Sequence, residues 1–167
     1  MKTWIDAGNK HRDMPERVPR KARVLFLCTG NSCRSQMAEG WANHLLGDIL
    51  EAYSAGVEQH GLDPRAVEVM AEAGVDISGH WAKGIGELPV RSFDHVITVC
   101  DRARSSCPFV PAEGQTLHRG FPDPPQLART ATNDQEALAS YREVRDAIRA
   151  FVQTLPKLLR SGRQDAE

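Results

Sequence analysis

A cysteine and an arginine six positions apart, Cys28 and Arg34, are the residues whose types and spacing most clearly indicate chemistry. A run of apolar residues, 24–27, precedes the cysteine, and a helical pattern begins directly after the arginine. The turn between them would point backbone N–H groups inward, and the helix adds its unpaired N–H groups and the positive end of its dipole. Such a loop binds a tetrahedral oxyanion without needing a metal ion.

The residue types inside this loop suit a nucleophile that works on a bound anion. An arginine binds two anion oxygens through its planar guanidinium, and a thiol beside cations and a helix N-terminus has a lowered pKa. Gly30 and Asn31 tolerate the positive φ of a tight turn, and the hydroxyls of Ser32 and Ser35 can donate to the Cys28 thiolate. The predicted oxyanion-binding loop consists of Thr29, Gly30, Asn31, Ser32, Cys33, Arg34 and Ser35.

Chance is the alternative explanation of such a short motif, with the cysteine an ordinary buried thiol at the end of a strand. The apolar run before Cys28, the turn-forming residues after it and the helix beyond them favour the anion site. Cys33 is interpreted as a small packing residue at the start of the helix. A protective disulfide between Cys28 and Cys33 is the weaker interpretation.

A second pair of cysteines, Cys100 and Cys107, flanks a polar segment that carries Arg102 and Arg104. Arginines favour thiolates, and the two thiols can approach each other if the segment moves. A thiol that attacks Cys28, followed by one that attacks this second thiol, makes a relay of thiol–disulfide exchange. The alternative is that Cys100 is a buried core thiol and that Cys107 has no role.

Asp123 is a candidate general acid. It lies in a proline-rich stretch, residues 121–125, which is predicted to be a loop. Beside an anion-binding nucleophile it could protonate a leaving oxygen, which is typically worth about 10²–10⁴ in rate. Taken alone, an aspartate before a proline is only a turn former. The gaps between the cysteines do not fit a zinc site and the 6 histidines share no ligand spacing, so neither a metal nor a cofactor is predicted.

Composition limits the classes of protein that are compatible with this chain. Its 167 residues suit one domain with a sizeable core, and a formal net charge of −1 does not favour a nucleic-acid partner. No apolar run approaches the ~20 residues of a membrane span, and the N-terminus lacks the apolar block of a secretory signal. We therefore expect a cytoplasmic protein whose 4 cysteines serve thiol chemistry or burial.

The order of predicted elements indicates an α/β fold. Strands are predicted over residues 23–27, 49–55 and 93–99 with a short last one near Leu117, and helices alternate with them. This alternation predicts a parallel sheet covered on both faces, with function at the carboxyl ends of the strands, where Cys28 and Cys100 would meet.

The sequence predicts that the chain consists of an arm, one domain and a tail. Residues 1–21 are predicted to form a polar arm, residues 22–160 one catalytic domain and residues 161–167 a polar tail. A helix is expected to start at Asp63-Pro64, and a long helix from Asn133 is expected to kink or end near Pro156.

The stretch from Cys28 to Trp41 resembles the phosphate-binding loop of the low-molecular-weight protein tyrosine phosphatase superfamily, most closely its thioredoxin-coupled arsenate reductase branch. The resemblance continues through residues 53–56 and 76–78, the second cysteine pair, and residues 118–124, and so covers about residues 22–155. It implies a three-layer fold, with a four-stranded parallel sheet and helices on both faces, and a role in arsenical resistance.

The resemblance also implies a mechanism. Cys28 attacks arsenate, held by Arg34 and the loop amides, and Asp123 protonates the departing hydroxyl. Cys100 then attacks the Cys28 adduct and releases arsenite, Cys107 attacks Cys100, and thioredoxin or another thiol reductant reduces the final disulfide. Phosphate and sulfate would compete with arsenate. This implied mechanism agrees with the relay expected from the residues themselves.

Two other functions fit the same loop. A phosphotyrosine phosphatase would act through a cysteinyl-phosphate on Cys28 without needing Cys100 or Cys107, and a weak side activity on aryl phosphates is expected even from a reductase. A redox-sensing, oxyanion-binding protein without turnover would use the disulfide as its signal.

Three residues or pairs depart from the pattern of the relatives. Arg102 and Arg104 stand where relatives are acidic or neutral, which leaves the identity of the reducing partner open. Asp123 is followed by Pro124-Pro125 and not by the Pro-Tyr that is common in true phosphatases. Some relatives bind potassium near residues that match Asn31, Glu39 and Ser54 together with a further acid. Lys83 takes the place of that acid, so an ammonium would replace the ion and no potassium requirement is predicted.

Overall fold

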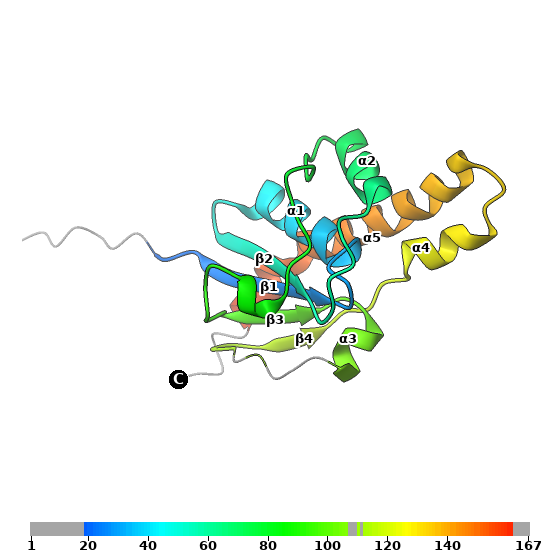
Figure 1. Ribbon diagram of the computed structural model, residues 1–167. Helices are drawn as coiled ribbons and strands as arrows, with labels where there is room; N and C mark the ends of the chain where they lie inside the picture. Colours follow the sequence, from blue (N-terminus) through cyan, green and yellow to red (C-terminus); the bar gives the residue numbers. More distant parts are fainter. Residues whose placement is uncertain (1–18, 107–109, 111, 162–167) are drawn as a thin grey trace, which may run out of the picture.

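A computed structural model describes residues 19–106, 110 and 112–161 of the chain. Cys107 and most of the predicted arm and tail lie outside these residues. The described part contains a sheet of four parallel strands in the order β2-β1-β3-β4 (Figure 1). Its strands are β1 (Ala22–Cys28), β2 (Leu50–Gly56), β3 (His95–Thr98) and β4 (Thr116–His118).

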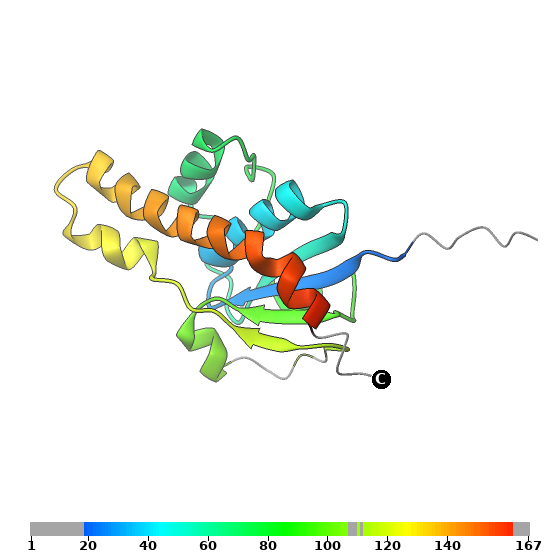
Figure 2. The same ribbon diagram turned by 180° about the vertical axis from the view of Figure 1, so that it is seen from behind.

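Helices follow the strands along the chain. They are α1 (Arg34–Leu46), α2 (Pro64–Glu72), the 3-10 helix η1 (Ile85–Glu87), α3 (Asp101–Ser106), α4 (Pro124–Leu127), the 3-10 helix η2 (Ala128–Thr130) and α5 (Asp134–Ser161). The helices α1, α2 and α5 lie together on one face of the sheet, with α5 crossing behind α1 and α2 in Figure 1 and in front of the sheet in Figure 2. The fold is therefore the predicted α/β class.

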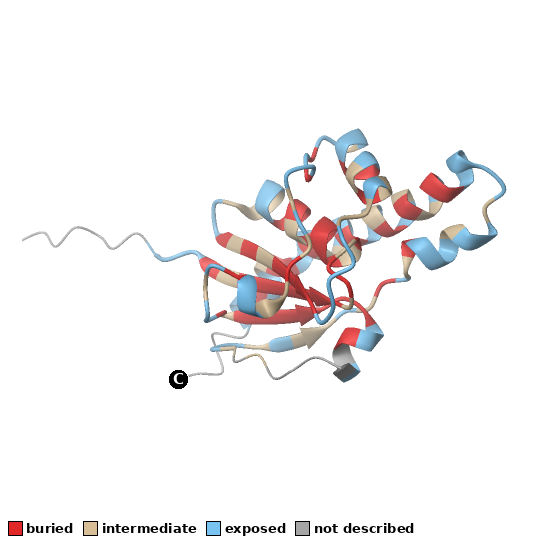
Figure 3. Ribbon diagram, viewed as in Figure 1, coloured by how far each residue is buried: buried red, intermediate tan, exposed pale blue. Residues whose placement is uncertain are grey.

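The central strand β1 is buried on both faces, as Figure 3 shows. Val24 and Phe26 pack into the larger core with α1, α2 and α5. Leu25 and Leu27 face the other way and pack with Leu88 and residues near it, so the segment around η1 covers this second face. A near-continuous apolar run is what such a doubly covered parallel strand requires.

The predicted start of α2 is confirmed in detail. Asp63 is the N-cap, and its carboxylate accepts a hydrogen bond of 2.9 Å from the Arg65 N–H. Pro64 occupies the first turn, where its missing N–H has no intrahelical partner to lose.

Of two predictions that rested on prolines, one was wrong and the other was wrong about where a helix ends. Pro124 and Pro125 were expected in a loop, but they form the first turn of α4, because the fixed φ of proline suits that turn. Pro156 was expected to kink or end the last helix, and the helix does not end there, since α5 continues through it to Ser161. Leu155 and Leu159 on either side of Pro156 are buried in the larger core, and this packing holds the last turns in place.

Candidate active site

The loop predicted to bind an anion joins the carboxyl end of β1 to the first turn of α1. Asn31 has a φ of +49°, as predicted for a turn residue. Gly30 does not share this conformation, so the prediction of a positive φ there was wrong. The glycine at this position gives room to the His60 side chain, because a Cβ would lie 2.5 Å from His60 Nδ1.

The segment after β2 holds the loop from outside through backbone hydrogen bonds. The carbonyl oxygens of Cys28, Thr29 and Gly30 accept N–H groups at distances of 3.3, 2.8 and 3.0 Å, respectively, from residues 57, 58 and 60. The N–H and C=O of a trans peptide plane point in opposite directions, so the amide hydrogens of the loop turn toward its inside. This is the arrangement that an oxyanion requires.

The sulfur of Cys28 lies against the start of α1. Cys28 Sγ is 3.0 Å from Ser35 Oγ, and Ser35 Oγ accepts a hydrogen bond of 2.8 Å from Asn31 Nδ2. Because the amide supplies one hydrogen to this hydroxyl, the hydroxyl's own hydrogen can point at the sulfur. The predicted contact of Ser35 with Cys28 is therefore present. Ser32, for which the same contact was predicted, lines the cavity in front of the loop instead.

Cys33 has a different environment from Cys28. It is the N-cap residue of α1, is buried and is a free thiol, as Cys28 is. Burial raises the pKa of the Cys33 thiol well above its usual range, and the nearby Asp63 carboxylate raises it further. Cys33 therefore stays protonated, in agreement with its predicted packing role.

The side chain of Arg34 is held at the edge of the loop. Its Nη1 donates a hydrogen bond of 3.0 Å to the Phe121 carbonyl, and its Nη2 lies 3.3 Å from Asp123 Oδ1. Arg34 and Asp123 both line a cavity of about 590 Å³ that also exposes Cys28 and Cys100. The cavity thus brings together the nucleophile, the cation and the acid that the sequence predicted.

Cys100 is the second of the two residues between β3 and α3. Its sulfur lies 3.3 Å from Thr29 Oγ1 and accepts a hydrogen bond of 3.3 Å from the Ala103 N–H. Cys100 is a free thiol that is 2% exposed. The predicted meeting of Cys28 and Cys100 at one edge of the sheet is confirmed, since both line the same cavity.

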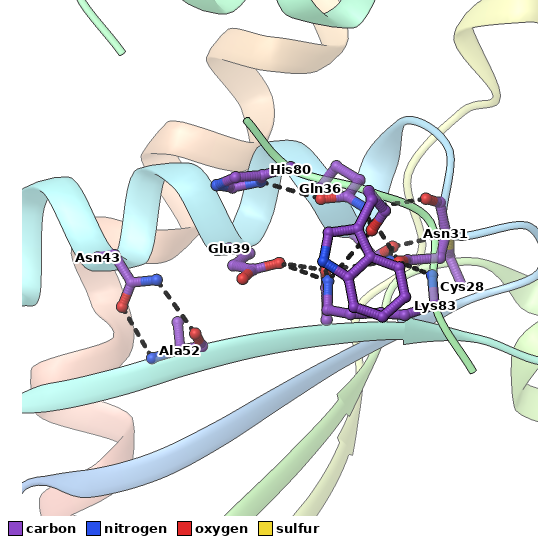
Figure 4. Close-up of polar contacts among 11 residues, drawn as sticks. Cys28, Asn31, Gln36, Glu39, Asn43, Ala52, His80 and Lys83 are labelled. Atoms are coloured by element: carbon purple, nitrogen blue, oxygen red, sulfur yellow. Dashed lines mark hydrogen bonds and ion pairs between the residues drawn. The ribbon is translucent and has the colours of Figure 1, made fainter. Parts of the chain in front are cut away.

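Behind the loop, Lys83 lies near Glu39 and Asn31, two of the three residues predicted to surround its ammonium group (Figure 4). Lys83 Nζ is 3.4 Å from Glu39 Oε2 and 3.4 Å from Ser54 Oγ, and the Ser54 hydroxyl donates to the same carboxylate. Asn31 Nδ2 also donates to Ser54 Oγ, at 3.0 Å. A chain of contacts therefore connects this buried ion pair with the Cys28 loop.

Two residues that support the loop were missed by sequence reasoning. The Gln36 amide donates to the carbonyl and the side-chain oxygen of Asn31, at 3.0 and 2.9 Å, and is fully buried. His60 lies beside Gly30 and lines the cavity. A polar residue on the buried side of α1 is a signal that could have identified Gln36. The position of His60 depends on long-range packing that no local pattern reveals.

The described residues contain neither a cluster of metal ligands nor a membrane-spanning helix. In this part of the chain, no group of three His, Cys, Asp or Glu side chains has the arrangement needed to hold a metal ion. None of its helices has the length and apolar character of a membrane span.

The chain belongs to the low molecular weight phosphotyrosine protein phosphatase family, whose model matches residues 23–165. Among its relatives, the arsenate reductase of Halalkalibacterium halodurans is 45% identical over 134 residues, which are 80% of this chain and 94% of that protein. The arsenate reductase of Bacillus subtilis is 47% identical over 125 residues, which are 75% of this chain and 88% of that protein.

Solved structures of both kinds of enzyme have this fold. An arsenate reductase in the phosphate-binding state has a TM-score of 0.65 and 30% identity, and the match covers 83% of this chain and 98% of that one. A low molecular weight protein tyrosine phosphatase from T. tengcongensis has a TM-score of 0.63 and 30% identity, with 82% and 99% covered. A thioredoxin-dependent arsenate reductase from Corynebacterium glutamicum has a TM-score of 0.60 and 26% identity, with 86% and 64% covered.

Proposed function

We propose that this protein reduces arsenate to arsenite through Cys28, Cys100 and Cys107. The observation that carries the proposal is the Cys100 thiol, which lies 3.3 Å from Thr29 Oγ1 in the cavity that holds Cys28. Hydrolysis of a phosphate ester has no use for a second thiol at this place. The relatives named arsenate reductase in Halalkalibacterium halodurans and Bacillus subtilis support the same function.

The first step forms a bond between sulfur and arsenic. The Cys28 thiolate attacks the arsenic atom while Arg34 and the inward-facing amides of the loop hold the other oxygens. One oxygen leaves as water after Asp123 supplies a proton to the departing hydroxyl. Since Asp123 lies 3.3 Å from Arg34 in the same cavity, it is well placed to reach an oxygen that the arginine holds.

The second step moves the electrons. The Cys100 thiolate attacks Cys28 Sγ, an S–S bond forms, the S–As bond breaks, and its electron pair stays on arsenic. Arsenic is thereby reduced from As(V) to As(III) and leaves as arsenite, while two thiols are oxidised to one disulfide. Cys107 then attacks Cys100 and frees Cys28 as a thiolate.

An external dithiol closes the cycle by reducing the Cys100–Cys107 disulfide. We propose thioredoxin or a similar thiol reductant for this role, and a protein of 26% identity is described as thioredoxin-dependent. The cycle requires no other cofactor. It also requires a thiol-reducing compartment, which supports a cytoplasmic location.

The alternative is a phosphatase that acts through a cysteinyl-phosphate on Cys28. The observation that favours it is the combination of loop, Arg34 and Asp123, together with the structural likeness to a protein tyrosine phosphatase. This reaction requires neither Cys100 nor Cys107. We expect it as a weak side activity on aryl phosphates.

Steady-state arsenate reduction with a thioredoxin system tests the proposal. We expect Cys100→Ser and Cys107→Ser to abolish multiple turnover, whereas Cys107→Ser still releases about one arsenite per chain because the first exchange needs only Cys28 and Cys100. Cys33→Ala is the matched control and should keep turnover. Unchanged turnover in both serine variants would overturn the proposal and favour the phosphatase.

A further inference from the structure

The helix that follows Cys100 is held at its first turn by a neighbouring strand. Asp101 Oδ1 lies 2.9 Å from Nε2 of His118, the last residue of β4. His118 Nδ1 lies 2.7 Å from Thr98 Oγ1 on β3. A carboxylate can only accept, so Nε2 carries a hydrogen, and in the neutral ring Nδ1 can accept from the threonine hydroxyl. The imidazole therefore joins α3 to two strands.

The backbone around His118 leaves room for this contact. A Cβ at Gly120 would lie 3.0 Å from Asp101 Oδ1 and 3.2 Å from His118 Nε2, so a larger residue at this position would crowd the pair. The Arg119 N–H donates to the Thr98 carbonyl at 2.9 Å and keeps the chain beside β3. The imidazole is thus anchored on the sheet, with its side chain 20% exposed, whereas the Asp101 side chain that it contacts is 92% exposed.

The segment that begins with His118, residues 118–123, also positions other groups of the site. Two residues after Arg119, the Phe121 N–H donates to the Val99 carbonyl at 3.1 Å, and the Phe121 carbonyl accepts from Arg34. Residues 118–123 therefore carry the predicted acid, hold the arginine and contact α3. A displacement of α3 relative to this segment would move Cys100 relative to the other reacting groups.

We propose that His118 is a positioning residue: through Asp101 it holds the first turn of α3 so that the Cys100 thiol faces the Cys28 loop. The inference rests on the proposed relay. Asp101 follows Cys100 directly, so the direction of the Cys100 side chain depends on where this turn lies. Attack on a sulfur requires close approach and alignment, and small misplacements of a reacting group slow such steps strongly.

A second contact at the same turn does not carry the inference. Arg102 Nη2 lies 3.8 Å from Glu58 Oε1, and both side chains are at least half exposed, at 70% and 50%. Two flexible, exposed side chains at a distance too long for a hydrogen bond contribute little to the position of a helix. The Asp101 contact differs because it is a hydrogen bond of 2.9 Å to a ring that is itself held on the sheet. The anchored His118 is therefore the residue to change.

Single-turnover arsenite release in a Cys107→Ser background tests the role of His118. We expect His118→Leu to slow release about tenfold, since the thiol is no longer held toward the loop. His118→Gln, which can still donate to Asp101, should restore most of the rate, and Asp101→Ala should match His118→Leu. The double variant should be no slower than either single one, because both remove the same contact.

Further measurements separate positioning from a general loss of structure. The KM for arsenate and the rate of Cys28 alkylation by iodoacetamide should remain unchanged in His118→Leu. Thr116→Ala, an exposed position on the same strand, is the matched control and should behave as wild type. A glutamine variant as slow as the leucine variant, with the same fall in Tm, would overturn the inference.

Disulfide formation with diamide, measured without arsenate, keeps this test independent of the proposed function. Diamide takes two electrons and two protons from two thiols, so in a Cys33→Ala, Cys107→Ser background it can join only Cys28 to Cys100. We expect His118→Leu to slow this reaction about tenfold as well. If arsenate is not reduced but the disulfide still forms more slowly, the proposed function fails and the inference holds. Equal rates of disulfide formation with leucine and histidine would overturn the inference.

Discussion

Cys28 and Cys33 lie five positions apart in one loop and differ in their chemistry. Cys28 lies beside the Ser35 hydroxyl, at 3.0 Å, and opens onto the cavity. Cys33 is buried, and burial together with the charge of Asp63 raises the pKa of its thiol. One thiol is therefore placed for reaction and the other for packing.

Alkylation should distinguish these two thiols. At pH 6 iodoacetamide should modify Cys28 quickly and leave Cys33 intact, since only a thiolate reacts well and Cys33 remains protonated. Phosphate or arsenate should slow the reaction by occupying the loop. Mass spectrometry of the digested protein checks the site. Slow modification of Cys28 that neither anion affects would contradict an activated nucleophile.

The contribution of Lys83 to the stability of the fold can also be measured directly. Its side chain is 10% exposed and that of Glu39 is 13% exposed, so Lys83→Met would leave a largely buried carboxylate without its cation. The free energy of unfolding should fall by about 3–5 kcal/mol, as is typical when one partner of a buried pair is removed. Urea denaturation measures this change, with Lys157→Met on the exposed side of α5 as the control.

The salt dependence of the wild type is predicted from the same ion pair. An ammonium already lies between Glu39 and Ser54, so arsenate reduction should proceed equally fast in potassium and sodium chloride of the same ionic strength. A rate that rises severalfold with potassium alone would contradict this prediction.

At the scale of elements, Gly56 at the end of β2 determines how closely this strand approaches the loop. A Cβ there would lie 2.3 Å from the Glu58 carbonyl and 2.8 Å from the Asn31 nitrogen, and both are backbone atoms that cannot turn away. Gly56→Ala should lower the free energy of unfolding by about 1–3 kcal/mol and weaken the protection of Cys28 by phosphate. Gly79→Ala, with open space around it, is the control. Full protection in Gly56→Ala would show that the loop tolerates this displacement.

Asp94 connects the start of β1 with the segment that leads into β3. Its carboxylate accepts hydrogen bonds from the Arg23 N–H at 2.7 Å and from Arg20 Nη2 at 2.9 Å. Partial burial raises the pKa of Asp94, but these hydrogen bonds and the charge of Arg20 outweigh burial and lower it below its ordinary value of 3.8. The contribution of this group is therefore present above pH 3.8 and is lost as pH falls through the lower value in the folded protein.

Asp94→Asn should accordingly destabilise the protein in a pH-dependent way. We expect the free energy of unfolding to fall by about 1–3 kcal/mol at pH 7, because a charged acceptor is lost. The difference between variant and wild type should shrink as the pH falls below 3.8. Urea denaturation at several pH values measures it, and a difference that grows toward acid would contradict the sign.

Local sequence signals predicted some element boundaries and not others. Asp63 and Pro64 specify a helix start through a cap and a first-turn proline, and α2 begins there. Pro124 and Pro125 gave the wrong prediction because a proline cluster fits both a loop and a first turn, and packing against α5 decides between them. The path of α5 past Pro156 likewise depends on tertiary contacts that the local sequence does not contain.

In the whole molecule, the carboxyl edge of the sheet gathers the residues of the site. Cys28 ends β1, Cys100 follows β3, and Asp123 follows β4. This part of the site could be predicted, because parallel strands place their carboxyl ends together. His60 could not be predicted, since its place beside the loop depends on contacts with a segment distant from the motif. Gln36 could be identified as a polar residue on the buried side of α1, but its partners depend on the detailed turn of the loop.

The most direct test of the central claim is to map the disulfide formed after one turnover of arsenate by the Cys107→Ser variant. Mass spectrometry of the protein, digested without reduction, identifies the bond, and the arsenite released is quantified in the same sample. The three-cysteine relay predicts a Cys28–Cys100 disulfide together with about one arsenite per chain. A Cys28–Cys33 disulfide, or arsenite release that leaves the Cys100 thiol intact, would contradict it.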